Sequence, residues 1–174
     1  MGIQFETDYN METLTAMAKG LRKTVRKKRS RRVHIFAAVV LILGLLTILA
    51  TVAGGEPLGA SGVVTLLALL VVILVSLFED KLNAWFARKR LLPGTEHAVA
   101  TFEEDGYVSA TGVTESRFSY AQIVAVAETA RYFVFALSSH HTQAYDKRNI
   151  RGGSVEDFRA FIAEKTGKLV ENIK

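Results

Sequence analysis

Two groups of side chains in this sequence have the types and spacing that a metal site or a catalytic acid–base pair could use. His140 and His141 are adjacent, and imidazole is a common ligand of transition metals. Glu103, Glu104 and Asp105 form an acidic triplet, and paired carboxylates can act as general acid and base. Adjacent residues in a turn rarely hold one ion without further ligands, and carboxylates on a hairpin tip stay solvated. We therefore expect neither a metal site nor an acid–base pair at these positions.

The sequence lacks the short motifs that are typical of common catalytic sites. No serine lies in a Gly-x-Ser-x-Gly elbow, and no glycine-rich loop ends in Gly-Lys-Ser/Thr. The sequence has no cysteine, which excludes disulfides, thiolate metal sites and a cysteine nucleophile. We expect no catalytic residue, no cofactor, no metal and no small-molecule substrate, so the protein is predicted not to be an enzyme.

One basic group lies beside a predicted helix. Lys147, Arg148 and Arg151 precede two glycines and a helix that begins after Ser154. A helix N-terminus with nearby cations can hold an anion, so these three residues are candidate contacts for a lipid headgroup. The alternative is a plain turn followed by a capped helix.

The composition and the charge distribution point to lipid rather than to nucleic acid. Of 174 residues, 49% are hydrophobic and only 22% are charged. The net charge is +5, but residues 19–32 alone carry nine Lys or Arg and no acid. Residues 91–174 carry nine bases and eleven acids, whereas a folded nucleic-acid-binding domain concentrates positive charge on its own surface. We expect no nucleic-acid partner.

Two apolar segments are long enough to cross a bilayer. Residues 33–53 and 60–78 contain no Asp, Glu, Lys or Arg, and as helices they reach about 31 and 29 Å. Neither has a polar stripe, and a wholly apolar helix in a small protein is stable only in lipid. Residues 54–59 have turn composition and no base, which predicts a short extracytoplasmic loop.

Basic residues flank both segments on the same side. Lys and Arg near the ends of membrane helices stay cytoplasmic, so we expect a multi-pass protein of the cell (inner) membrane with both termini in the cytoplasm. The residues expected at the membrane interface are Arg26, Lys27, Lys28, Arg29, Arg31, Arg32, Trp85, Arg88, Lys89 and Arg90.

The segments beside the two spans are predicted to be helical. Residues 1–32 contain a strand-like stretch at 3–9 and then a basic amphipathic helix, which either orients the first span or lies on the inner leaflet. Residues 79–94 continue the second span as a juxtamembrane helix that stops before Pro93. Glu79 and Asp80 emerge at the depth of Arg31 and Arg32, which predicts an ion pair across the hairpin.

Residues 95–174 have the pattern of a small cytoplasmic α+β domain. Short apolar runs separated by turn signals predict five to seven antiparallel strands, at 98–103, 107–111, 116–120, 123–128, 131–137 and 142–145. An amphipathic helix follows, with Ser154 as N-cap, Asp157 three residues later and Gly167 at its end. We expect a bent antiparallel sheet or partial barrel capped by the C-terminal helix.

The C-terminal part of the chain contains an ordered set of short motifs. They are Phe102-Glu103-Glu104-Asp105-Gly106, Tyr120-Ala121-Gln122-Ile123-Val124, Glu128-Thr129, Tyr132-Phe133-Val134-Phe135 and Lys147-Arg148. Together with the layout of a strand-like segment, a basic helix, a two-span hairpin and a C-terminal domain, this set resembles the YcxB-like family of bacterial membrane proteins. The resemblance implies a pleckstrin-homology-like cytoplasmic domain on a membrane hairpin, and it implies no active-site residue.

These patterns leave three hypotheses for function. The first is a non-enzymatic integral membrane protein whose domain binds a protein partner or another copy of itself. The second is a sensor of anionic lipid headgroups that uses Lys147, Arg148 and Arg151. The third is a membrane enzyme of an unrecognised type.

Overall fold

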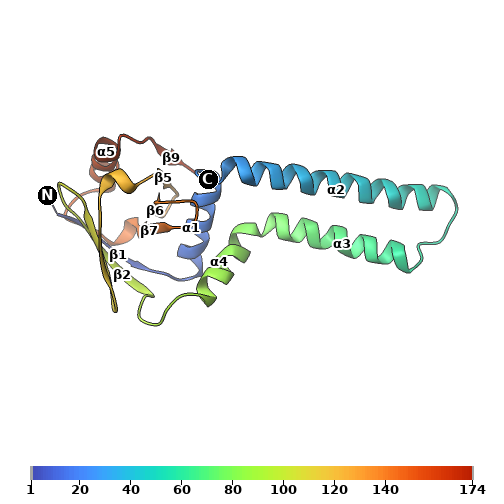
Figure 1. The fold of residues 1–174 in the computed structure, drawn as a ribbon, viewed down its shortest axis with the longest axis horizontal. Coiled ribbons are helices and arrows are strands. Elements are labelled where there is room, and N and C mark those ends of the chain that lie inside the picture. The colour runs from blue at the N-terminus through green and yellow to red at the C-terminus, as the bar shows by residue number, and fades with distance from the viewer. Residues whose placement is uncertain (1, 174) are drawn as a thin grey trace.

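The computed structural model describes residues 2–173 and has two parts, a helical hairpin and a two-sheet domain (Figure 1). The hairpin consists of α2 (Lys27–Ala53) and α3 (Ala60–Leu77), joined by a short loop. Both helices are long and apolar enough to cross a membrane. No residue of α2 is buried, and Leu69 is the buried residue of α3. The large apolar side chains predicted to face lipid therefore face outward.

The helix after the second span differs from the sequence prediction. We predicted one helix running on to Pro93, but α3 ends at Leu77 and α4 (Glu79–Lys89) begins after a break at Phe78. After the break, α4 packs on α1 (Met11–Lys23). Ala84 of α4 is completely buried. Burial of this face favours the bend over a straight exit from the hairpin.

Two β-sheets form the domain. The first has the order β4-β3-β2-β1-β8 and the second the order β7-β6-β5-β9. All pairs are antiparallel except β5 with β9, so the fold is α+β with one mixed sheet and no closed barrel. The strands are β1 (Ile3–Asp8), β2 (His97–Phe102), β3 (Tyr107–Thr111), β4 (Glu115–Phe118), β5 (Ala125–Glu128), β6 (Tyr132–Ala136), β7 (Thr142–Asp146), β8 (Ile150–Arg151) and β9 (Val170–Asn172). Short 3-10 turns η1 (Tyr120–Gln122) and η2 (Lys147–Asn149) precede β5 and β8.

The N-terminal strand lies inside the first sheet. β1 pairs with β2 along its whole length, from Ile3 opposite Phe102 to Asp8 opposite His97, and its other edge pairs with β8. Sequence reasoning began the domain at residue 95, and the structure adds β1 and α1 to it. The chain therefore leaves the domain, forms the hairpin and returns to the strand next to the one it left.

An aromatic core lies between the sheets and α5 (Val155–Thr166). Phe5, Phe102, Phe133, Phe135 and Phe158 are fully buried, and the Phe5 and Phe158 ring centroids are 4.6 Å apart. Such edge-to-face contacts add to the stabilisation from burying aromatic area. Side chains alternate along β6, so Phe133 and Phe135 both lie in this core.

The predicted caps of the C-terminal helix are confirmed. Ser154 Oγ accepts a hydrogen bond from the Asp157 backbone N–H, and Asp157 Oδ2 accepts one from the Ser154 backbone N–H. Gly167 ends the helix at φ 62°, in the left-handed region that favours glycine.

Candidate membrane interface

Helix α1 connects the domain to the hairpin. One side of α1 packs on β6, where Ala16 joins Tyr132 and Val134 in a second apolar cluster. The opposite side packs on α4, so α1 lies between the sheet and α4 instead of lying alone on a leaflet. Figure 1 shows α1 at the base of the hairpin, directly before α2.

Small residues let α1 approach the sheet closely. A Cβ atom at Gly20 would lie 2.6 Å from Val134 Cγ1, much closer than carbon atoms normally come. Thr13 on the same side is buried and lies 3.2 Å from the Tyr132 hydroxyl. The apolar stripe that marks this helix in the sequence is formed by Met11, Leu14, Ala18, Leu21 and Val25. Thr13, Ala16 and Gly20 lie outside it, which is why the sequence did not indicate this contact.

An ion pair fastens α1 to α4. Arg22 donates two hydrogen bonds to Asp80, from Nε to Oδ1 at 2.7 Å and from Nη2 to Oδ2 at 2.6 Å. Glu79 lies 3.8 Å from Arg22 Nε and 3.7 Å from His34 Nε2. The predicted pairing of Glu79 and Asp80 with Arg31 and Arg32 is therefore wrong, because the bend at Phe78 directs both carboxylates toward α1 instead.

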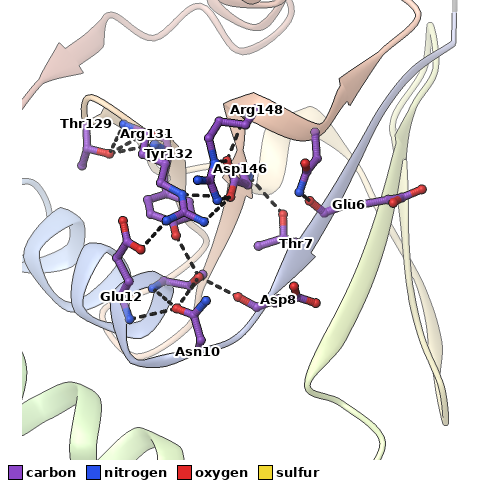
Figure 2. Close-up of polar contacts among 12 residues, drawn as sticks. Glu6, Thr7, Asp8, Asn10, Glu12, Thr129, Arg131, Tyr132, Asp146 and Arg148 are labelled. Atoms are coloured by element: carbon purple, nitrogen blue, oxygen red, sulfur yellow. Dashed lines mark hydrogen bonds and ion pairs between the residues drawn. The ribbon is translucent and has the colours of Figure 1, made fainter.

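A second polar network holds the start of α1 against the turn between β5 and β6 (Figure 2). Asp146 is buried and accepts hydrogen bonds from Arg131 Nε at 3.0 Å and Nη2 at 2.8 Å. Arg131 also pairs with Glu12 of α1, and Asp146 pairs with Arg148 at 3.0 Å. Charge-assisted contacts from two sides keep the buried Asp146 carboxylate satisfied.

A third network surrounds the buried Glu128 side chain. Arg159 Nε and Nη2 donate to its two oxygens at 2.7 and 2.8 Å, and Lys147 Nζ donates at 2.9 Å. These hydrogen bonds, those of Arg159 first, lower the pKa of Glu128 to about 2. Lys147 also donates to the Thr129 carbonyl oxygen at 2.7 Å.

The three candidate headgroup residues meet three different carboxylates. Lys147 pairs with Glu128 and has a side chain only 13% exposed. The exposed Arg148 pairs with Asp146, and the exposed Arg151 lies 3.1 Å from Glu6. Arg151 belongs to β8, which pairs with the first half of β1, at the end of the molecule away from the hairpin (Figure 1).

The residues predicted for the membrane interface gather at the base of the hairpin. Lys89 Nζ lies 3.5 Å from the centroid of the half-exposed Trp85 ring, a cation–π contact. Arg26 Nε donates to the Ser139 carbonyl oxygen at 2.6 Å, which ties the β6–β7 loop to the start of α2. The remaining residues of this set are all exposed: Lys27, Lys28, Arg29, Arg31, Arg32, Arg88 and Arg90.

A groove of about 720 Å³ opens at this base, between α1, the start of α2, α4 and the β6–β7 loop. Its floor is apolar and its rim carries arginines and the histidine pair. We call it the basal groove. Its walls come from three regions far apart in the chain, residues 14–33, 79–90 and 140–142, so no local sequence pattern could indicate it.

The acidic triplet lies at the tip of the β2–β3 hairpin, and the histidine pair lies in the β6–β7 loop. Among residues 2–173 no group of three or more His, Asp and Glu side chains is placed to hold an ion. Glu104 pairs with Lys165, and the hairpin it belongs to is closed by Tyr120, whose hydroxyl donates to the carbonyl oxygens of Glu103 and Gly106 at 2.6 and 3.0 Å. Two of the motif segments quoted above therefore meet in the fold.

This hairpin and the network around Glu128 lie within the part of the chain that a family model recognises. Residues 102–162 match the YcxB-like protein family. The YcxB-like region thus begins at the end of β2 and ends within α5, and it confirms the family resemblance expected from the sequence. No curated protein and no solved structure matches the chain.

Proposed function

We propose that this YcxB-like protein is a non-enzymatic integral membrane protein that holds a pleckstrin-homology-like domain at the cytoplasmic membrane face. In this proposal α2 and α3 span the inner membrane, both termini are cytoplasmic, and the domain binds a protein partner or a second copy of the chain.

The observation that carries the proposal is the firm connection between hairpin and domain. Arg22 and Asp80 join α1 to α4 through two hydrogen bonds, and Gly20 lets α1 pack tightly on β6. A domain fixed in this way keeps one orientation relative to the bilayer, unlike a domain on a flexible linker. A fixed orientation suits a surface that must meet a partner in the plane of the membrane.

The architecture and the charges support the rest of the proposal. Two bent sheets with a C-terminal helix over the core are the arrangement of pleckstrin-homology-like domains. The bases beside α2 and α4 favour a cytoplasmic domain, because such bases are retained on the cytoplasmic side.

Exposed apolar side chains beside the hairpin offer a contact surface. Leu92 and Val113 are 68% and 59% exposed. They lie on neighbouring segments, because Gly112 N donates to the Gly94 carbonyl oxygen at 3.0 Å. A shared apolar surface of this kind favours protein contacts.

Cysteine cross-linking of the full chain in native membranes tests the proposal. The chain has no cysteine, so Val113→Cys supplies one thiol on the expected surface and Leu169→Cys supplies a matched control that is 88% exposed. We expect a maleimide–benzophenone reagent, which couples to the introduced thiol and then photo-cross-links to an adjacent protein, to give one discrete adduct with Val113→Cys and only monomer with Leu169→Cys. Mixing two differently tagged chains identifies a self-adduct.

Two results contradict the proposal. Equal cross-linking of both variants indicates random collision, and monomer in both indicates that the Val113 surface has no partner. Glu56→Cys, in the loop between the spans, tests topology independently, because an impermeant maleimide must label it from outside intact cells and leave Val113→Cys unlabelled.

A further inference from the structure

The basal groove has an apolar floor that continues into the outer surface of the hairpin. Leu14, Met17 and Leu21 of α1 line its inner side. Val33 of α2 and Phe86 of α4, which are 54% and 51% exposed, also line the groove. Val33 is also the first residue of the uncharged run in α2, so the groove opens at the level where that run begins.

The rim of the basal groove is positively charged. Among residues 2–173, Arg26, Arg29 and Arg90 take part in no ion pair, whereas Arg22 is neutralised by Asp80. Glu79 is the acid that lines the groove, and it lies beside Arg22. His140 and His141 complete the rim from the β6–β7 loop. An anion entering the groove therefore meets three unneutralised guanidinium groups.

We infer that the basal groove binds one anionic membrane phospholipid, an inference that rests on the membrane insertion proposed above. The phosphate lies among Arg26, Arg29 and Arg90, which can form charge-assisted and bidentate hydrogen bonds with phosphate oxygens. The acyl chains leave along Val33 and Phe86 toward the outer surface of the hairpin. The groove volume of about 720 Å³ lies within the range of small-ligand sites and accommodates a headgroup with its glycerol.

The joined apolar and basic surfaces select a lipid over a soluble phosphate. A free phosphate needs only the arginines, and it would leave the floor formed by Leu14, Met17 and Leu21 in contact with water. A zwitterionic lipid brings its own cation toward three arginines, and such like-charge contacts oppose binding. Only an anionic amphiphile satisfies both the floor and the rim.

Native mass spectrometry of the full chain in detergent tests this inference, with phosphatidylglycerol and phosphatidylcholine of identical acyl chains as probes. The groove variant Arg29→Gln/Arg90→Gln removes two rim charges. The control Arg31→Gln/Arg88→Gln removes two exposed arginines near the same positions of α2 and α4 that do not line the groove.

We expect defined differences in affinity between the two lipids and between the two double variants. We expect phosphatidylglycerol to bind the native chain more tightly than phosphatidylcholine. Because each base beside an anionic lipid contributes about fivefold, the groove variant should lose about thirtyfold in affinity for phosphatidylglycerol. The control variant should bind like the native chain.

A second variant separates the groove from general charge effects. Ala87→Trp adds bulk to the groove lining and keeps every arginine, so it should also weaken binding of phosphatidylglycerol. Equal losses in the groove and control variants, or equal binding of the two lipids, overturn the inference. Displacement of the lipid by an equal concentration of glycerol phosphate also overturns it, because it indicates a site for soluble phosphate esters. These variants leave Val113 and Glu56, the positions used to test association and topology, unchanged, so failure of one proposal is distinguishable from failure of the other.

Discussion

At the scale of single residues, buried charges hold the domain together. Glu128 illustrates this, because it is 5% exposed and receives hydrogen bonds from a guanidinium and an ammonium group. Removing one member of a buried ion pair leaves the other members unpaired in a region of low polarity. The three networks around Asp80, Asp146 and Glu128 therefore act as fixed points of the fold.

The low pKa of Glu128 predicts a specific acid sensitivity. Its pKa is about 2 in the folded chain and has an ordinary value of 4.5, so its contribution to stability is complete at neutral pH and is lost as the pH falls from about 5 to about 2. We expect Glu128→Gln to lower the free energy of unfolding by about 3 kcal/mol at pH 7. The difference from the native chain should shrink steadily in denaturant titrations at pH 5, 4 and 3.

An exposed glutamate gives the control for this titration. Glu104 pairs with Lys165, but its side chain is 72% exposed and water competes for the contact. Glu104→Gln should leave the unfolding curve unchanged. A difference in the free energy of unfolding between Glu128→Gln and the native chain that stayed constant between pH 7 and pH 3 would contradict the assigned pKa.

At the scale of elements, α1 packs closely on β6 because residue 20 is glycine and has no side chain. We expect Gly20→Ala to destabilise the native chain by about 1–2 kcal/mol, because its Cβ overlaps Val134. In a Val134→Ala background the same change should stabilise by up to about 1 kcal/mol, because alanine favours helix over glycine. Chemical denaturation of the four chains measures both values, and the same sign in both backgrounds would contradict the contact.

The link between α1 and α4 can be measured in the same way. A partly buried bidentate pair predicts that Asp80→Asn costs about 1–2 kcal/mol and that Asp80→Asn and Arg22→Gln together cost less than their sum. In hydrogen exchange of Asp80→Asn, the backbone amides of α4 should lose protection before those of the two sheets. Arg31→Gln, which removes a residue outside any ion pair in residues 2–173, is the control and should have no effect. Additive losses would exclude a direct coupling.

Elements with a strong local pattern could be predicted from the sequence, and contacts between distant elements could not. The strand at 107–111 and the N-cap Ser154 agree with the structure because side-chain alternation and capping are local properties. The short strands β8 and β9 have too few residues to show alternation. Gln143 is buried, and its Oε1 accepts hydrogen bonds from the Tyr107 and Tyr145 hydroxyls, a contact between strands that no local pattern shows.

Only part of the candidate site could be predicted from the sequence. The basic and aromatic residues beside the spans could be chosen from the sequence because charge beside an apolar run is visible along the chain, and their contact with lipid stays a prediction. The basal groove could not be predicted, because its histidines and arginines converge only after α4 bends back onto α1. Sequence reasoning paired Asp80 with Arg31 because it assumed a straight helix through Phe78.

At the scale of the whole molecule, the domain is not a C-terminal module that can be cut off. A fragment of residues 91–174 lacks β1, which lies between β2 and β8 and places Phe5 in the core. We expect this fragment to show no cooperative unfolding and to bind dyes that report exposed apolar surface.

A second fragment provides the matched comparison. Joining residues 2–26 to residues 79–174 with a Gly-Ser linker removes the hairpin and keeps β1, α1 and α4. It should unfold cooperatively, with the near-ultraviolet signal of a packed aromatic core. A stable fragment of residues 91–174 alone would contradict the structural importance of β1.

The order in which the ribosome delivers these strands has a consequence for biogenesis. β1 is synthesised first, and its neighbour β2 follows only after the whole hairpin, so at about 5–20 residues per second the roughly 90 residues between Asp8 and His97 take about 5–18 s. During that interval the nascent N-terminal segment has no sheet to join. In the proposed topology, delivery of the hairpin to the insertion machinery and completion of the first sheet are therefore ordered events, and a chain that fails to insert has to close its sheet around an aggregation-prone apolar loop.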